Sequence, residues 1–210
     1  MMARKQKRWL APIAALLMLV GTPMAMAKTL LVYGDSLLAG YGLPTEDGFQ
    51  AQLKAALDKA GVEVKIQNAS VSGDTTAMGL ARVDWALGDV PDAVLLGLGG
   101  NDMLQGLPVG EARANLAALL DKFKAVGAPV MLLGMKANRG LGPDYVTEFD
   151  GMYGDLAKQY GTALYPFYLD GVAFDPKLNQ ADGIHPNAEG VKVIVKKITP
   201  AVIEFLKKSG

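Results

Sequence analysis

Residues 29–36 read Thr29-Leu30-Leu31-Val32-Tyr33-Gly34-Asp35-Ser36, an apolar run that ends in a glycine and two polar residues. A short apolar run closed by glycine is typical of a buried strand. Similar runs recur along the chain, and segments with apolar residues at helical spacing separate them. The predicted strands are residues 29–33, 62–67, 93–98, 129–133 and 163–167.

Apolar residues at helical spacing fill the intervals between these strands. Gly61 is expected to close the first long helix, and Pro200 to kink or interrupt the last one. The alternation predicts an α/β fold, a single three-layer α/β/α domain with a five-stranded, mostly parallel sheet. Reactive groups in such folds lie in loops beyond the carboxyl ends of the strands. The predicted helices are residues 49–60, 75–87, 108–126, 145–160 and 187 onward.

The first 27 residues have the features of an export signal. A basic stretch precedes the apolar run Leu10–Val20, and Ala25-Met26-Ala27 has the small residues of a cleavage site. The run is shorter than the roughly 20 residues that span a bilayer, which favours a cleaved signal over a membrane anchor. We therefore expect a signal peptide over residues 1–27, a mature domain over 28–210, and a periplasmic or secreted protein without a transmembrane segment after cleavage.

Composition excludes several classes of protein. The chain has no cysteine, which excludes disulfide frameworks, thiolate zinc sites and cysteine nucleophiles. Without the four basic residues of the export segment, 17 basic residues face 21 acidic ones, a formal charge of −4. A mild negative balance argues against nucleic acid and anionic membranes as primary partners. No pattern in the sequence specifies an oligomeric state.

Polar segments follow the first three predicted strands, at the points where the chain leaves the sheet. Ser36 follows the first strand, so its hydroxyl and its own N–H can face one pocket. Gly73 lies after the second strand, where a glycine lets a backbone N–H approach a ligand closely. Asn101 follows the third strand and offers a neutral amide donor suited to an oxyanion.

The chain has one histidine, His185, in the segment Asp182-Gly183-Ile184-His185-Pro186-Asn187. A histidine that acts as a general base needs a carboxylate to hold it and a group to deprotonate. Asp182 supplies the carboxylate three residues upstream, and Ser36 is the candidate hydroxyl. A Gly-Asp-Ser turn, a Gly-Asn-Asp turn or a lone histidine is, taken singly, more often structural. Their joint occurrence in this order, beside strand ends, indicates chemistry.

These segments resemble the motifs of the SGNH, or GDSL, hydrolase superfamily. The resemblance runs from about Thr29 to the final helix and implies the flavodoxin-like SGNH hydrolase fold. Gly79-Leu80-Ala81-Arg82 and the exported N-terminus are similar to the periplasmic acyl-CoA thioesterase I, lysophospholipase L1 and arylesterase group. The four matching motifs are Gly34-Asp35-Ser36-Leu37-Leu38-Ala39-Gly40-Tyr41-Gly42, Asn68-Ala69-Ser70-Val71-Ser72-Gly73-Asp74-Thr75-Thr76, Gly99-Gly100-Asn101-Asp102 and Asp182-Gly183-Ile184-His185-Pro186-Asn187.

The resemblance implies a role for each matching residue. Ser36 would be the nucleophile, and His185 the general base and then the general acid. Asp182 would orient His185 and stabilise its imidazolium form. The oxyanion hole would consist of the N–H groups of Ser36 and Gly73 and the side-chain amide of Asn101.

The implied reaction is a two-step acyl transfer from a carboxylic ester or thioester, through an acyl-enzyme that water hydrolyses. No cofactor and no metal are expected, because one histidine, no cysteine and no close carboxylate cluster leave few ligands. The aspartates Asp35, Asp74 and Asp102 are instead expected to hold loops by hydrogen bonds.

Acyl or aryl substrates are implied, small esters or thioesters that include lipid-derived ones. Met103, Leu104 and Leu107 follow the oxyanion asparagine and are candidates for the acyl-binding wall, although ordinary core packing explains them equally well. Residues 136–145 form a candidate second wall. Within it, residues 138–143 show little match to the most similar group, which leaves the acyl chain-length preference open.

Two alternatives to this esterase stay open at this point. The first is a carbohydrate O-deacetylase on the same scaffold, which should carry aromatic platforms for sugar rings near the site. Trp85 is the one tryptophan of the mature sequence, and it falls in the second predicted helix, away from the expected mouth. The second is a non-catalytic periplasmic binding or scaffold protein, which the intact nucleophile, base and oxyanion positions disfavour.

Overall fold

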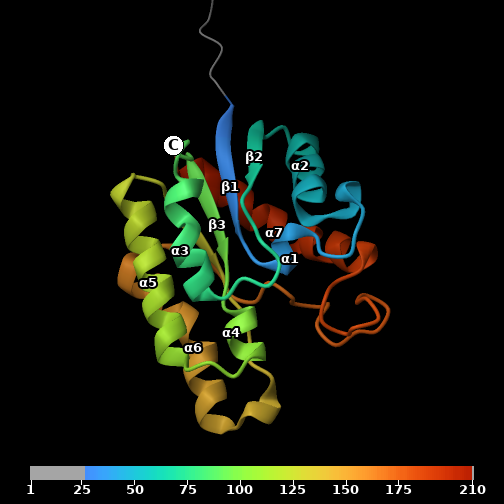
Figure 1. The fold of residues 1–210 in the computed structure, drawn as a ribbon. Helices are drawn as coiled ribbons and strands as arrows, with labels where there is room; N and C mark the ends of the chain where they lie inside the picture. Colours follow the sequence, from blue (N-terminus) through green and yellow to red (C-terminus); the bar gives the residue numbers. More distant parts are fainter. Residues whose placement is uncertain (1–26, 210) are drawn as a thin grey trace, which may run out of the picture.

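The computed structural model describes residues 27–209, which form a five-stranded sheet with helices on both faces (Figure 1). The strand order is β2-β1-β3-β4-β5, and every pairing is parallel. The predicted three-layer α/β/α domain with five strands is confirmed. The strands are β1 (Lys28–Gly34), β2 (Val64–Asn68), β3 (Ala93–Gly97), β4 (Val130–Leu133) and β5 (Ala163–Tyr165).

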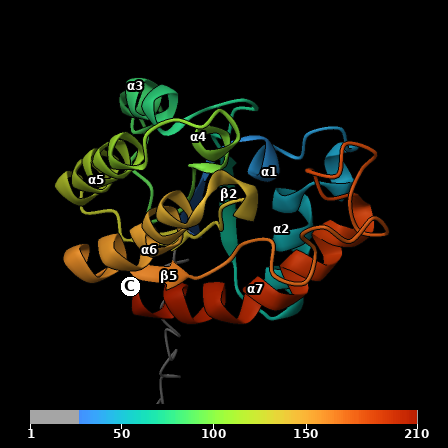
Figure 2. The ribbon, with the colours of Figure 1, turned by 90° about the horizontal axis from the view of Figure 1, so that it is seen from below.

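The long helices lie in two layers, with the sheet between them (Figure 2). Helix α2 packs on α7 in one layer, and α5 packs on both α3 and α6 in the other. The long helices are α2 (Phe49–Lys59), α3 (Thr76–Ala86), α5 (Val109–Ala125), α6 (Pro143–Tyr160) and α7 (Ala188–Lys208). The short ones are α1 (Ser36–Ala39), η1 (Thr45–Asp47), α4 (Gly100–Leu104) and η2 (Arg139–Leu141).

The two central strands carry the core, because helices cover both of their faces. The side chains of residues 30–33 on β1 and 93–96 on β3 are fully buried. Each buried Leu or Val contributes about 1.5–3 kcal/mol relative to an exposed one. In a chain without cysteine, this burial is the main source of stability. The rigid sheet in turn fixes the loops that leave its carboxyl edge.

The helix ends follow local signals in the sequence. Gly61 has φ 73° directly after α2, and the N–H of Val62 donates to the carbonyl of Leu57 at 2.9 Å. The prediction that Gly61 closes this helix is therefore confirmed. Thr75 caps α3 through its hydroxyl, and the Asn187 side chain caps α7 by accepting the N–H of Gly190 at 3.0 Å.

Of the two outcomes expected at Pro200, a kink or an interruption, the interruption does not occur, since α7 continues from Ala188 to Lys208. The ring of Pro200 lies on the exposed side of α7, so the carbonyl of Lys196 that loses its partner can bind water. Buried Ile198 and Val202 flank Pro200 and hold both halves of the helix on the sheet. Tertiary packing here outweighs the local cost of proline.

The N-terminal export segment predicted over residues 1–27, with cleavage after Ala27, lies outside the described residues apart from Ala27 itself. No helix within residues 27–209 is both long and apolar enough to cross a membrane. The four short helices α1, η1, α4 and η2 were not predicted, and α4 (Gly100–Leu104) forms where the sequence indicated a turn.

Candidate active site

Ser36 begins helix α1 at the carboxyl end of the inner strand β1. The Asp35 side chain caps this helix by accepting the N–H of Leu37 at 3.0 Å. Gly34 allows the sharp exit from the strand, because a Cβ atom there would lie 2.5 Å from the carbonyl oxygen of Gly97 on the neighbouring strand. The turn therefore presents the Ser36 hydroxyl beyond the edge of the sheet.

His185 lies between Ser36 and Asp182. Its Nε2 atom is 2.9 Å from the Ser36 Oγ atom, and its Nδ1 atom is 2.6 Å from Asp182 Oδ2. The structure thus brings together the three residues that the sequence nominated, although 149 positions separate Ser36 from His185. A hydroxyl, an imidazole and a carboxylate in one hydrogen-bonded line are the arrangement that activates a serine nucleophile.

Asp182 is held in its ionised form by the loop around it. Its Oδ1 atom accepts the backbone N–H groups of His185 at 3.0 Å and of Ile184 at 2.9 Å. The backbone N–H of His185, its ring and the N–H of Ile184 lower the pKa of Asp182 to about 2. The carboxylate is thus charged and fixed beside the imidazole.

Two residues that the sequence reasoning missed position the His185 loop. The Gln180 backbone N–H donates to the carbonyl of His185 at 2.7 Å. Its side-chain amide donates to the carbonyls of Tyr41, at 2.8 Å, and Pro186, at 3.0 Å. The Tyr41 ring lies against the imidazole, with ring centroids 4.6 Å apart. Tyr41 lies within the first quoted motif, which was the available signal for it, whereas no pattern marked Gln180.

Gly73 and Asn101 are linked through Asp74, the residue that follows Gly73. Gly73 has φ 90°, a conformation that favours glycine, and a Cβ atom at this position would meet open space. The Asn101 side-chain amide donates to the carbonyl of the next residue, Asp74, at 2.9 Å. An amide group has two N–H donors, so one remains for a ligand. Val71 joins this loop to the nucleophile turn, as its N–H donates to Gly34 at 2.9 Å.

The other aspartates near the site are structural, as their contacts show. Asp102 is 2% exposed, and its carboxylate accepts the backbone N–H of Thr76 at 2.8 Å and its hydroxyl at 2.6 Å. Asp74 accepts Arg82 Nε at 2.5 Å. Burial raises the pKa of Asp35 to about 7, against the opposing N–H of Leu37. Within residues 27–209, no group of three or more acidic or histidine side chains is arranged to hold a metal ion.

The three candidate acyl-wall residues have different surroundings. Met103 is partly buried and packs against the core. Leu104 is 54% exposed, on the short helix α4 that also carries Asn101. Leu107 is half-buried, and its carbonyl accepts the Tyr145 hydroxyl at 3.1 Å. Only Leu104 therefore presents most of its side chain to the solvent beside the site.

Comparison with known proteins agrees with this geometry. Residues 32–193 match the model of the GDSL-like Lipase/Acylhydrolase family. The chain belongs to this family. Among relatives of this GDSL-family enzyme, Esterase TesA of Pseudomonas aeruginosa is 41% identical over 186 residues, covering 88% of this chain and 92% of that one. Thioesterase 1/protease 1/lysophospholipase L1 of Escherichia coli K12 is 36% identical over 200 residues, covering 93% and 94%.

The solved structure of a related enzyme has the same fold. AlinE4, described as an SGNH-hydrolase family esterase, superposes with a TM-score of 0.73 at 43% identity, covering 86% of this chain and 97% of that one. The predicted superfamily, fold and enzyme class are thereby confirmed. This GDSL-family protein is a serine ester hydrolase, and the alternative of a non-catalytic binding protein is set aside.

Proposed function

We propose that Ser36, His185 and Asp182 form the catalytic triad of an enzyme that hydrolyses carboxylic esters and thioesters of acyl or aryl substrates. One observation carries this proposal: His185 contacts Ser36 Oγ through one ring nitrogen, at 2.9 Å, and Asp182 through the other, at 2.6 Å. A neutral imidazole in this position can take the serine proton while its other N–H stays on the carboxylate.

The reaction then proceeds in two steps. Ser36 Oγ attacks the carbonyl carbon while its proton passes to His185 Nε2, and the tetrahedral intermediate collapses as His185 protonates the leaving alcohol or thiol. A water molecule next gives a proton to His185 and attacks the acyl-enzyme. As the second tetrahedral intermediate collapses, His185 returns this proton to Ser36 Oγ, which releases the carboxylic acid and restores the serine. Asp182 remains ionised throughout and stabilises the imidazolium that forms in each step.

The oxyanion that forms in both steps needs donors that are already in place. We assign this role to the N–H groups of Ser36 and Gly73 and to the free side-chain N–H of Asn101. The Ser36 N–H lies at the start of α1. Gly73 and Asn101 are both connected to Asp74, which follows Gly73 in the chain and accepts the other side-chain N–H of Asn101 through its carbonyl. Loss of one such donor typically lowers turnover by about 10²–10³.

The proposed substrates are defined by chemical class. Small-molecule esters follow from the enzyme class, and the thioesterase and lysophospholipase names of a relative support thioesters and lipid-derived esters. Met103, Leu104 and Leu107 are proposed to border the acyl chain, with exposed Leu104 the strongest of the three. Trp85, the candidate sugar platform of a deacetylase, lies in the last turn of α3 and is 82% exposed there. That turn leads toward the start of β3, so no observation favours the deacetylase.

Export completes the proposal. The basic stretch, the apolar run and the small residues that precede Lys28 support cleavage after Ala27 and a periplasmic or secreted enzyme. Fractionation of cells that express the full chain tests this, together with the N-terminal residue of the recovered protein. We expect the protein outside the cytoplasm with Lys28 first, and an intact N-terminus in the membrane fraction would contradict it.

Hydrolysis of p-nitrophenyl butyrate by protein that begins at Lys28 tests the reaction. Ser36→Ala should lower kcat by at least about 10⁴ with an unchanged melting temperature, because only the nucleophilic oxygen is removed. Ser72→Ala, which removes an exposed hydroxyl from the neighbouring loop, should retain activity. Full activity in Ser36→Ala would overturn the assignment. Esters from acetate to palmitate, acyl thioesters, lysophospholipids and acetylated sugars then define the substrate range.

A further inference from the structure

Arg82 lies on α3, at the point where the ends of two neighbouring strands meet. Its side chain is 21% exposed and contacts three residues, which lie in the turn before Ser36 and in the loop after β2. The Nε atom donates to the Asp74 carboxylate at 2.5 Å, and Nη1 donates to the carbonyl of Ala69 at 2.6 Å. The Nη2 atom is 3.3 Å from the carbonyl oxygen of Gly34. A side chain on a helix leans toward the helix N-terminus, which directs this guanidinium toward the carboxyl edge of the sheet.

The guanidinium also stands over an aromatic ring, and this limits where it can go. Its central carbon is 4.2 Å from the centroid of the Tyr33 ring. The Tyr33 hydroxyl donates to the carbonyl of Gly79 at 2.6 Å, so the same helix holds both partners. Arg82 is therefore fixed by a fork of hydrogen bonds and by a face-on contact, which a lysine cannot reproduce.

The two segments that Arg82 holds carry or contact the three proposed oxyanion donors. Gly34 precedes Ser36 by two residues, so its position helps to set the direction of the Ser36 N–H. Asp74 follows Gly73, so the position of its carboxylate constrains the peptide that carries the Gly73 N–H. Asp74 also accepts the Asn101 amide through its carbonyl oxygen, at 2.9 Å.

We propose that Arg82 is the positioning residue of the oxyanion hole, holding the turn before Ser36 and the loop around Gly73 in register through Gly34, Ala69 and Asp74. The inference rests on the proposed oxyanion donors. Arg82 itself donates to the protein in all three hydrogen bonds, so its effect on the reaction passes through the groups that it aligns. A displacement of about 1 Å in such donors is enough to cost on the order of 10² in rate.

Arg82→Lys tests this, because it keeps the charge and removes the fork. We expect kcat to fall about 10–100-fold with KM changed by less than threefold, since a misaligned oxyanion hole weakens the transition state more than the bound ester. The rate of inactivation by a p-nitrophenyl phosphonate, whose adduct on Ser36 carries a tetrahedral oxyanion mimic, should fall by a similar factor. Asp74→Asn, which keeps the carbonyl and removes the charge, should give a smaller loss of the same kind and serves if the lysine variant does not fold.

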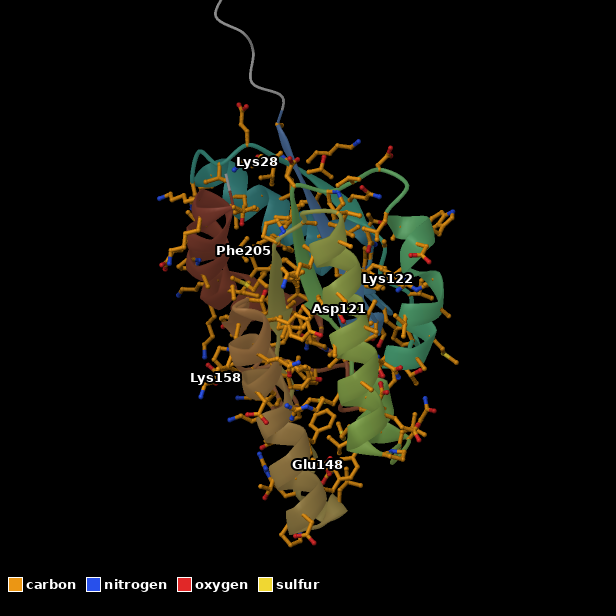
Figure 3. All side chains as sticks on the ribbon, turned by 90° about the vertical axis from the view of Figure 1, so that its left-hand side faces the viewer. Lys28, Asp121, Lys122, Glu148, Lys158 and Phe205 are labelled. Carbon is orange, nitrogen blue, oxygen red and sulfur yellow. The ribbon has the colours of Figure 1, made fainter. Side chains whose placement is uncertain are left out.

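The matched control is Lys122→Gln. Lys122 lies on α5 (Figure 3), and its Nζ atom donates to the two carboxylate oxygens of Asp84 on α3 at 2.7 and 2.9 Å. This exposed ion pair therefore contacts the same helix as Arg82 does. This variant should keep kcat, KM and the phosphonate rate within twofold of the parent enzyme. Equal losses of kcat in Arg82→Lys and Lys122→Gln would mean that α3 acts only through general stability, and the inference would be wrong.

A double-mutant cycle with Asn101→Ala separates this inference from the function on which it rests. Asn101→Ala alone tests the oxyanion hole, and no loss of kcat in that variant would overturn the assignment of the hole and the inference with it. If Asn101→Ala lowers kcat, Arg82→Lys should cost at least fivefold less in its background than in the parent enzyme, because the hole is already incomplete. Fully additive losses would overturn the role of Arg82 alone.

Discussion

Gln180 Nε2 donates a hydrogen bond to the carbonyl oxygen of Tyr41 at 2.8 Å, and so ties the loop of His185 to the loop that follows the nucleophile turn. Gln180→Ala removes this link and leaves its carbonyl acceptors without their donor. We expect kcat/KM to fall about tenfold and the melting temperature to fall by about 4–8 °C, since two side-chain hydrogen bonds are lost and each costs roughly 1 kcal/mol. Gln52→Ala, whose side-chain amide donates to Glu46 at 2.8 Å on the surface, is the control. Similar losses of activity in both variants would contradict the positioning role of Gln180.

His185→Ala should leave almost no activity, because this is the only imidazole in the chain and no substitute base exists. Residual hydrolysis should come from the oxyanion hole and binding alone. Asp182→Asn should lower kcat by up to about 10⁴ with little change in KM, because it removes the charge that stabilises the imidazolium. Steady-state kinetics on one ester series measures both effects. Asp170→Asn, which breaks the exposed pair with Lys197, should retain activity and controls for charge removal.

Asp182 itself should affect stability only in stronger acid. Its folded pKa is lower than its unfolded one, so its contribution to stability is complete above about pH 4 and is lost as the pH falls toward 2. Urea denaturation of the wild type and Asp182→Asn across this range measures the difference in free energy of unfolding. That difference should shrink as the pH falls, and a constant difference would contradict the lowered pKa of Asp182.

Asp35→Asn should show the opposite dependence. Burial raises the pKa of Asp35 from 3.8 to about 7, so the folded protein holds a proton that the unfolded chain releases. The free energy of unfolding of the wild type should therefore fall as the pH rises from about 4 to about 7, by at most about 1.4 kcal/mol per pH unit from this one group. The variant does not titrate there and can still accept the N–H of Leu37, so its stability relative to the wild type should rise with pH. An equal difference at every pH would contradict the burial argument.

Leu104→Ala should change substrate preference more than stability. Leu104 is 54% exposed, so its truncation should cost less than about 1 kcal/mol, and the longer acyl esters should lose the most kcat/KM. Val126→Ala, at an exposed site in the turn after α5, is the control. Met103→Ala should instead destabilise the protein because Met103 packs against the core. Equal chain-length profiles for Leu104→Ala and the parent enzyme would remove Leu104 from the proposed acyl wall.

Much of the fold could be predicted because its signals are local. The central strands are fully buried apolar runs, and Gly61 marks a helix end by its backbone conformation. Pro200 shows the limit of such reasoning, since buried residues on either side override its local preference. The short helix α4 also escaped prediction, because Gly99-Gly100-Asn101-Asp102 has the composition of a turn.

The proposed site could be nominated from the sequence only where a residue type is itself informative. A lone histidine three residues after an aspartate is such a signal, and the structure brings both to Ser36. Gln180 carried no comparable signal, because its function depends on an acceptor 139 positions away, the carbonyl of Tyr41. The role of Arg82 likewise depends on contacts with the ends of two strands, which only the folded chain creates.

The most direct test of the central claim is to map the adduct formed with a p-nitrophenyl phosphonate. Protein that begins at Lys28 is inactivated with the reagent, digested, and its modified peptide sequenced by mass spectrometry. The proposed mechanism predicts one phosphonyl group per chain on Ser36, a rate of modification that follows the loss of esterase activity, and no modification in His185→Ala on the same timescale. Loss of activity with the phosphonyl group on any residue other than Ser36 would contradict it.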